Sequence, residues 1–136
     1  MLRSILAVIA GSLAWTVMWL GSNAALLKLF PGWYGESGRV ESLPVLLFII
    51  FRSVVFSVLA GYLTALIARR RELQHTFALG LWQLALGLIA TAQFYDAAPL
   101  WYHLFFLVLL IPANVLGGQL RMVQKSKVVR GSIGLA

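Results

Sequence analysis

The chain has 136 residues, of which 61% are hydrophobic and 11% are charged, and its formal net charge is +7. This composition excludes a soluble domain of the same size, because too few polar side chains are present to cover a surface in water. The chain has no cysteine, which excludes disulfides, thiolate metal sites and a cysteine nucleophile. The length is sufficient for about four membrane-spanning helices of roughly 20 residues each.

The first apolar run extends from about residue 5 to residue 30, after Arg3 and before a Pro-Gly pair at 31–32. A basic start, an apolar stretch and small residues at 22–24 are also typical of a secretory signal that is cleaved. The apolar part of such a signal has about 7–15 residues, and this run is longer. We therefore expect a retained first span, with a cleaved signal as the alternative.

The second span is predicted at residues 44–68, after a polar loop at 31–42, and it contains a charged residue near its middle. Arg52 lies about nine residues, hence roughly 13 Å, inside the membrane. A charge at this depth costs at least about 2.5 kcal/mol and normally has a partner. No predicted span carries a carboxylate in its middle that would neutralise Arg52.

Helical periodicity places Arg52 about 120° around the second span from a stripe of small residues, so it is not expected to point into the seam of the bundle. Three kinds of partner remain open. Arg52 reaches the outer surface and meets Glu41 or Asp96, or it meets an acidic or carbonyl group of another subunit, or it binds a ligand, a lipid headgroup or an anion. The second alternative would make the chain part of a larger assembly.

The third and fourth spans are predicted at residues 76–94 and 100–120, so that residues 1–120 form one four-span domain followed by a basic tail at 121–136. Most basic residues near the ends of spans fall on one side: Arg3, Arg69, Arg70, Arg71, Arg121, Lys125, Lys127 and Arg130. Because an excess of Lys and Arg marks the cytoplasmic side, both chain termini are predicted to be cytoplasmic. This rule also accounts for the net charge, and since no nucleic-acid-reading motif accompanies it, no nucleic-acid partner is expected.

Each predicted span collects its small and polar residues on a single face, as a four-helix bundle with an internal seam requires. Small residues that let helices approach closely are predicted at Ser53, Ser57, Gly61, Gly80, Gly87 and Gly117. A polar seam inside the membrane is predicted at Asn23, Gln83, Gln93 and Asn114. Gln83 and Asn114 lie at matching depths, roughly 10–12 Å from the inner surface. We expect them to share a hydrogen bond, which either joins two helices or belongs to an ion pathway.

His103 follows two aromatic residues at the outer start of the fourth span, where a histidine is typical of the aromatic belt. Ligation of a pigment or a haem by His103 is the alternative. No second histidine, cysteine or carboxylate stands at metal-binding spacing from it, so no metal site is predicted and no cofactor is indicated. Arg121 and the rest of the basic tail are expected to contact anionic lipids or a partner protein.

The sequence thus predicts an all-α protein, an integral membrane four-helix bundle in a membrane of the bacterial inner, or cytoplasmic, type. It contains no recognisable nucleophile set, paired carboxylates or phosphate-binding loop, so no enzymatic activity is expected. The favoured function is a non-catalytic accessory or structural subunit of a larger membrane protein complex, with Arg52, His103 and Arg121 as contacts to a partner or ligand. The alternative is a small homo-oligomeric channel or transporter for an ion or small solute, in which Arg52 and the polar seam line a path between protomers.

Overall fold

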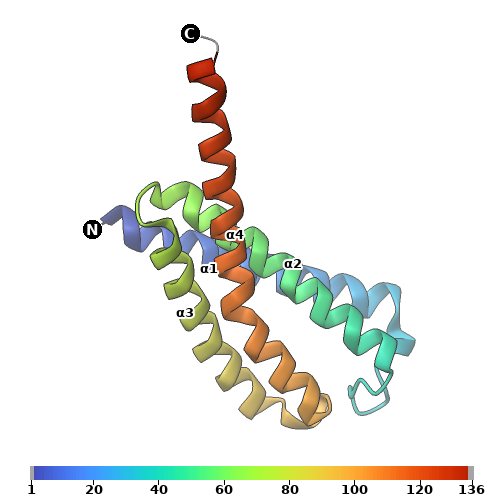
Figure 1. Cartoon of the computed structure of the whole chain (residues 1–136). Coiled ribbons are helices and arrows are strands. Elements are labelled where there is room, and N and C mark those ends of the chain that lie inside the picture. Colours follow the sequence, from blue (N-terminus) through green and yellow to red (C-terminus); the bar gives the residue numbers. More distant parts are fainter. Residues whose placement is uncertain (1, 135–136) are drawn as a thin grey trace.

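A computed structural model describes residues 2–134 as four long helices, which confirms the predicted all-helical fold. The elements are α1 (Leu2–Leu29), the short turn η1 (Pro31–Trp33), α2 (Leu43–Ala68), α3 (Glu72–Gln93), the turn η2 (Tyr95–Ala97) and α4 (Leu100–Gly134) (Figure 1). All four long helices are of sufficient length and hydropathy to cross a membrane. The chain therefore has the elements of a membrane helical bundle.

The connection between α2 and α3 is a tight turn of three arginines. Arg69 and Arg71 have positive φ angles of 60° and 50°, a backbone conformation that is uncommon for residues other than glycine. Arg69 ends α2 in this conformation, and its N–H still donates to the carbonyl of Ala65. α3 therefore begins at Glu72, four residues earlier than predicted. A carboxylate is favourable in the first turn of a helix, where the helix dipole is positive.

The fourth helix differs most from the prediction, because it does not end near residue 120 but continues to Gly134. The pair Gly117-Gly118 does not terminate it, since both glycines lie at helix contacts: a Cβ on Gly117 would collide with the carbonyl of Val58, and one on Gly118 with Thr76. At 1.5 Å per residue, the 35 residues of α4 are about 52 Å long. The predicted basic tail is thus an extension of α4 as far as the structure describes it, and residues 135–136 lie outside the described range.

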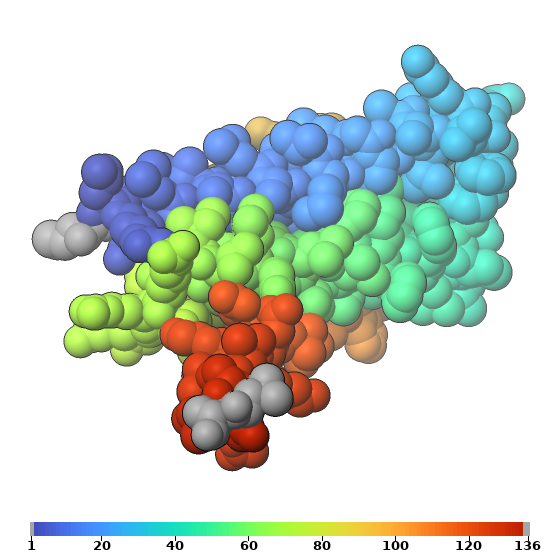
Figure 2. All heavy atoms as spheres, turned by 90° about the horizontal axis from the view of Figure 1, so that it is seen from above, coloured from blue at the N-terminus to red at the C-terminus, as the bar shows by residue number. Residues whose placement is uncertain are grey.

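α2 is the central helix and packs against the other three. The pair α1–α2 and the pair α3–α4 diverge from one end of the molecule toward the other (Figure 1). The view from above shows α1 and the end of α4 on opposite sides of α2 (Figure 2). α2 therefore has one side that faces α1 and another that faces α4.

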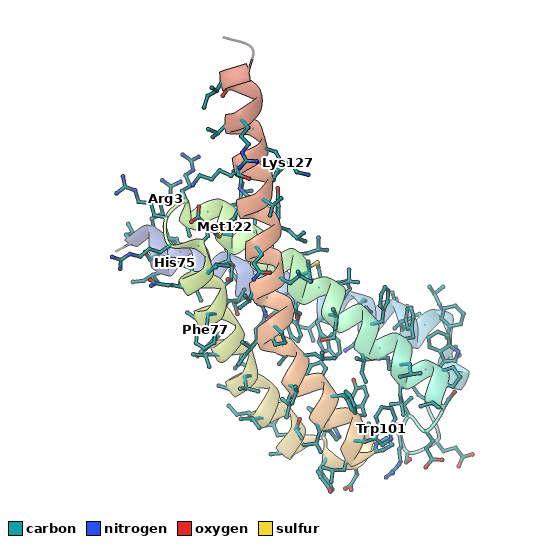
Figure 3. All side chains as sticks on the ribbon, viewed as in Figure 1. Arg3, His75, Phe77, Trp101, Met122 and Lys127 are labelled. Atoms are coloured by element: carbon teal, nitrogen blue, oxygen red, sulfur yellow. The ribbon has the colours of Figure 1, made fainter. Side chains whose placement is uncertain are left out.

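The two ends of the molecule differ in chemistry. Arg3, His75 and Lys127 lie toward one end, and Trp101 lies at the other (Figure 3). The two ends are hereafter called the basic end and the aromatic end.

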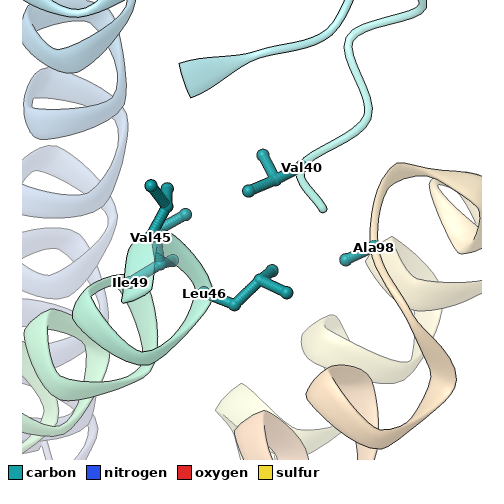
Figure 4. Close-up of a cluster of buried hydrophobic side chains, with 5 residues drawn as sticks. All are labelled: Val40, Val45, Leu46, Ile49 and Ala98. Atoms are coloured by element: carbon teal, nitrogen blue, oxygen red, sulfur yellow. The ribbon is translucent and has the colours of Figure 1, made fainter. Parts of the chain in front are cut away.

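At the aromatic end, a cluster of buried side chains fills the space between the diverging helix pairs: Val40, Val45, Leu46, Ile49 and Ala98 (Figure 4). Aromatic residues from α1, α4 and the first loop pack against this cluster. The backbone N–H of Val40 donates to the carbonyl of Ala97 at 3.0 Å, which ties the first loop to the α3–α4 connection. The loops thus hold the open end of the helix pairs together.

The contact between α2 and α4 is the closest in the bundle, because glycines allow the two backbones to approach. A Cβ on Gly61 would collide with the carbonyl of Asn114, as one on Gly117 would with that of Val58. On α3, a Cβ on Gly80 would meet Ile111 at 2.9 Å and one on Gly87 would meet Leu107 at 2.8 Å, both on α4. Ser53 and Ser57 are buried as well, so all six small residues of the predicted seam lie within the bundle.

Candidate functional site

Arg52 lies inside the bundle, with only 7% of its surface exposed. Its Nη2 donates a hydrogen bond to Oδ1 of Asn23 on α1, at 2.5 Å. Its guanidinium carbon lies 4.6 Å from the centre of the Trp19 ring and 5.9 Å from that of Phe56, within the range of a cation–π interaction. Arg52 therefore connects α2 to α1.

The expectation that Arg52 points away from the seam was wrong. α1 covers that side of α2 and also contacts the stripe of small residues, because Nε1 of Trp15 donates to Oγ of Ser57. α4 approaches the same stripe at Gly61.

The ion pair with Glu41 or Asp96, one of the three alternatives for Arg52, is also not formed in residues 2–134. Glu41 pairs instead with Arg39 at 3.3 Å, and Nη1 of Arg39 donates to the backbone carbonyl of Asp96 at 3.4 Å.

The positive charge of Arg52 is only partly stabilised by these neighbours. Nε and Nη1 are buried and have no hydrogen-bond acceptor among the described residues. A cation–π interaction contributes about 0.5–2 kcal/mol, whereas a charged side chain at the centre of a membrane costs at least about 2.5 kcal/mol. An arginine cannot lose its charge by deprotonation inside a protein. The stability of the buried Arg52 side chain therefore depends strongly on its one acceptor, Oδ1 of Asn23.

The expected hydrogen bond between Gln83 and Asn114 is present. Nδ2 of Asn114 donates to Oε1 of Gln83 at 2.7 Å and also to the backbone carbonyl of Leu110 at 2.7 Å. Both amides are buried, with 3% and 0% exposure. Within residues 2–134, Nε2 of Gln83 and Oδ1 of Asn114 have no partner. The pair links α3 to α4 from inside the bundle.

The predicted polar seam is therefore divided into two separate pairs, Asn23–Arg52 between α1 and α2 and Gln83–Asn114 between α3 and α4. Gln93 belongs to neither. It is the last residue of α3, is exposed, and lines a shallow surface pocket near Arg39. The structure thus places Gln93 apart from the other three predicted seam residues.

His103 is buried at the aromatic end and belongs to the packing of the loops. Its Nε2 lies 3.2 Å from the backbone carbonyl of Tyr95, and the two rings are stacked with centres 6.1 Å apart. Because a carbonyl oxygen can only accept, this contact requires the tautomer in which Nε2 carries the proton and donates a hydrogen bond. His103 thus connects α4 to η2.

The basic end is held together by side chains that reach across helices. Nε of Arg3 donates to the carbonyl of Ile67 at 2.7 Å. Nζ of Lys125 pairs with the Glu72 carboxylate at 2.9 Å and donates to the carbonyl of Arg69 at 3.2 Å. Arg121 stays on α4, where it donates to Oε1 of Gln124 at 2.9 Å. The start of α1, the arginine turn and the first part of the α4 extension therefore lie together.

Asn23 was not predicted as the partner of Arg52, although the sequence contains a signal for this pairing. Asn23 lies about six residues before the end of α1, and Arg52 about nine residues after the start of α2. The two side chains are therefore at similar depth below the aromatic end, by the same comparison that identified Gln83 and Asn114. Trp19 lies one turn before Asn23 and shares its helix face.

Known proteins offer no guide to the role of these residues, since no family model, no curated protein and no solved structure matches this chain. The architecture itself is that of four apolar helices compatible with a membrane bundle. Its internal polar groups join pairs of helices, and most of its exposed basic residues lie at one end.

Proposed function

We propose that this chain is a non-catalytic accessory subunit of a larger membrane protein complex. The observation that carries the proposal is the extension of α4: every residue from 122 to 134 is exposed, yet the helix continues without a break. The last side chains that tie α4 to the bundle are Gln124, bonded to Tyr62, and Lys125, paired with Glu72. The rest of the extension stands away from the bundle (Figure 1).

Such an extension gains stability when another chain covers it. The extension continues α4, so its helix is already nucleated, but each further turn depends on the helix propensity of its own residues. The extension contains Val128, Val129 and Gly131, which are poor helix formers. A partner that buries part of its surface would supply the stabilisation that its own residues lack.

The surface of the extension favours an acidic helical partner. Met122, Ser126, Val129 and Ile133 follow one another at intervals of four, three and four residues, which places them on one face in a heptad pattern. Lys127 and Arg130 add positive charge beside this face. Two copies of the extension would oppose like charges, whereas an acidic partner would complement them.

The proposed orientation in the membrane places the basic end in the cytoplasm, and with it both chain termini. It is supported by the concentration of Lys and Arg at this end, because such residues are retained on the cytoplasmic side. The tryptophan and tyrosine residues at the opposite end are typical of the other membrane interface. We further propose a membrane of the bacterial inner type, in which both termini would be cytoplasmic.

The channel alternative has less support from the contacts within the chain than the subunit proposal. It required Arg52 and the polar seam to line a path between protomers. Arg52, Gln83 and Asn114 are instead buried in contacts between helices of one chain. An ion path between copies would need such groups on the outer surface.

The test is recovery of the tagged chain from its native membrane in mild detergent, with identification of stoichiometric polypeptides. The double variant Lys127→Gln, Arg130→Gln should lose the partner subunit. The control double variant Arg69→Gln, Arg70→Gln removes the same charge from the same end but leaves the extension intact, and should retain it. Equal retention by both double variants would contradict docking at the extension.

A further inference from the structure

A groove of about 530 Å³ runs between α1 and α3 and is independent of the α4 extension. Its walls are mainly apolar, with Ile5, Val8 and Leu13 from α1 and Trp82 from α3 among the lining residues. At the end of the groove farther from the basic end of the molecule, Nε1 of Trp82 donates to Oγ of Ser12 at 3.1 Å. These two polar atoms are therefore paired with each other. The groove therefore offers an apolar surface along one side of the bundle.

The length of the groove corresponds to one leaflet of a membrane. It extends along α1 from Ser4 to Leu13, nine residues apart, which is about 13 Å at 1.5 Å per residue. The hydrocarbon core of a bilayer is about 30 Å thick, so the groove covers nearly half of it. A partner helix that crossed the membrane would need a contact surface of about twice this length.

One end of the groove, lined by Ser4 and His75 and here called its opening, lies at the basic end of the molecule. His75 lines it there, and Nδ1 of His75 lies 2.9 Å from the carbonyl of Arg71. Arg3 immediately precedes the first lining residue, Ser4, and is held at this end by its bond to Ile67. Arg3 and Arg71 are exposed, and Figure 3 shows Arg3 and His75 at the same end of the molecule.

The opening is positively charged overall. Glu72 is the only acidic residue of the α2–α3 turn and α3 within the described range, and Lys125 neutralises it. An anionic group at the opening would therefore meet basic side chains without a competing carboxylate.

We propose that this groove binds an anionic phospholipid of the leaflet on the basic side. One acyl chain lies along Val8, Leu13 and Trp82, and the phosphate lies near Arg3 and Arg71. The apolar walls, the length of one leaflet and the basic opening each match a part of this ligand. The site is distinct from the extension of α4, so it stands whether or not the extension docks a partner.

The test measures lipid retention by the purified chain with native mass spectrometry, using phosphatidylglycerol and phosphatidylcholine with identical acyl chains. We expect phosphatidylglycerol to be retained preferentially. The double variant Arg3→Gln, Arg71→Gln should weaken its binding about 25-fold, since each basic residue near a membrane surface contributes about fivefold. The control Lys127→Gln, Arg130→Gln removes the same charge elsewhere and should change binding less than twofold.

A second pair of variants tests the apolar part of the site. Val8→Trp fills the groove and should reduce retention of both lipids, while Val17→Trp, at an exposed position of α1 outside the groove, should not. Cross-linking of a phosphatidylglycerol with a photoreactive acyl chain to residues 5–13 of the wild-type chain gives a readout that does not depend on variants. Equal retention of the two lipids, or cross-links elsewhere on the chain, would overturn the proposal.

Discussion

Arg52 carries a buried charge whose stabilisation depends on very few neighbours. One of its nitrogens is bonded to Asn23, and Trp19 and Phe56 lie against the guanidinium. The remaining N–H groups lack acceptors among residues 2–134. Removal of a partner from a buried charged group leaves its desolvation cost uncompensated, whereas replacement of the charge by an apolar side chain removes that cost.

This asymmetry gives a prediction for the two partners. Asn23→Ala should lower the free energy of unfolding by about 1–3 kcal/mol, because it leaves the arginine without its acceptor. Arg52→Met should change it less, or raise it, because it exchanges the charge for a side chain of similar length. Thermal unfolding in detergent measures both. Gln93→Ala, which truncates an exposed amide, is the control. A larger loss in Arg52→Met than in Asn23→Ala would show that Arg52 is stabilised by groups beyond these contacts.

The contact between α2 and α4 depends on the absence of side chains at two glycines. Gly61 and Gly117 each lie against a backbone carbonyl of the opposite helix. Such close approach permits extensive van der Waals packing, which is the main source of helix association in a membrane. The outward surface of the same helices consists of apolar residues.

Alanine at two helical glycines should therefore have opposite effects. Gly61→Ala should destabilise the protein by about 1–3 kcal/mol, since the added methyl group forces the backbones of α2 and α4 apart. Gly21→Ala is the matched control on α1: nothing lies within 4 Å of its Cβ position, and alanine should stabilise the helix by about 0.5–1 kcal/mol. Unfolding temperatures of both variants measure the difference. A neutral Gly61→Ala would contradict the close contact.

The helices themselves could be predicted from apolar runs. The Gln83–Asn114 pair could be predicted too, because each residue's depth follows from its position along its own helix. The extent of α4 could not. Gly117 and Gly118 resemble a stop signal in sequence, but they are required by contacts with α2 and α3. The environment of Arg52 also could not be predicted, since the side of α2 that α1 covers is decided by packing among all four helices.

The two ends of the whole molecule differ in chemistry, with basic groups at one end and aromatic groups at the other. The antiparallel order of the four helices brings the start of α1, the α2–α3 turn and the α4 extension to the basic end. In the proposed orientation, this end faces the cytoplasm and the first loop faces outward.

The absence of cysteine allows this orientation to be tested with single cysteines in an otherwise unreactive chain. Ser37→Cys, in the exposed first loop, should react with a membrane-impermeant thiol reagent added to intact cells. Ser132→Cys, in the exposed extension, should react only after the membrane is permeabilised. Reaction of Ser132→Cys in intact cells, with Ser37→Cys protected, would reverse the proposed topology.

The role as an accessory subunit is tested most directly by the mass of the assembly that the wild-type chain forms in its native membrane. We predict a complex that contains this 15.0 kDa chain and at least one different polypeptide in fixed stoichiometry. A mass equal to one copy of the chain, or to a whole multiple of it, would contradict the account.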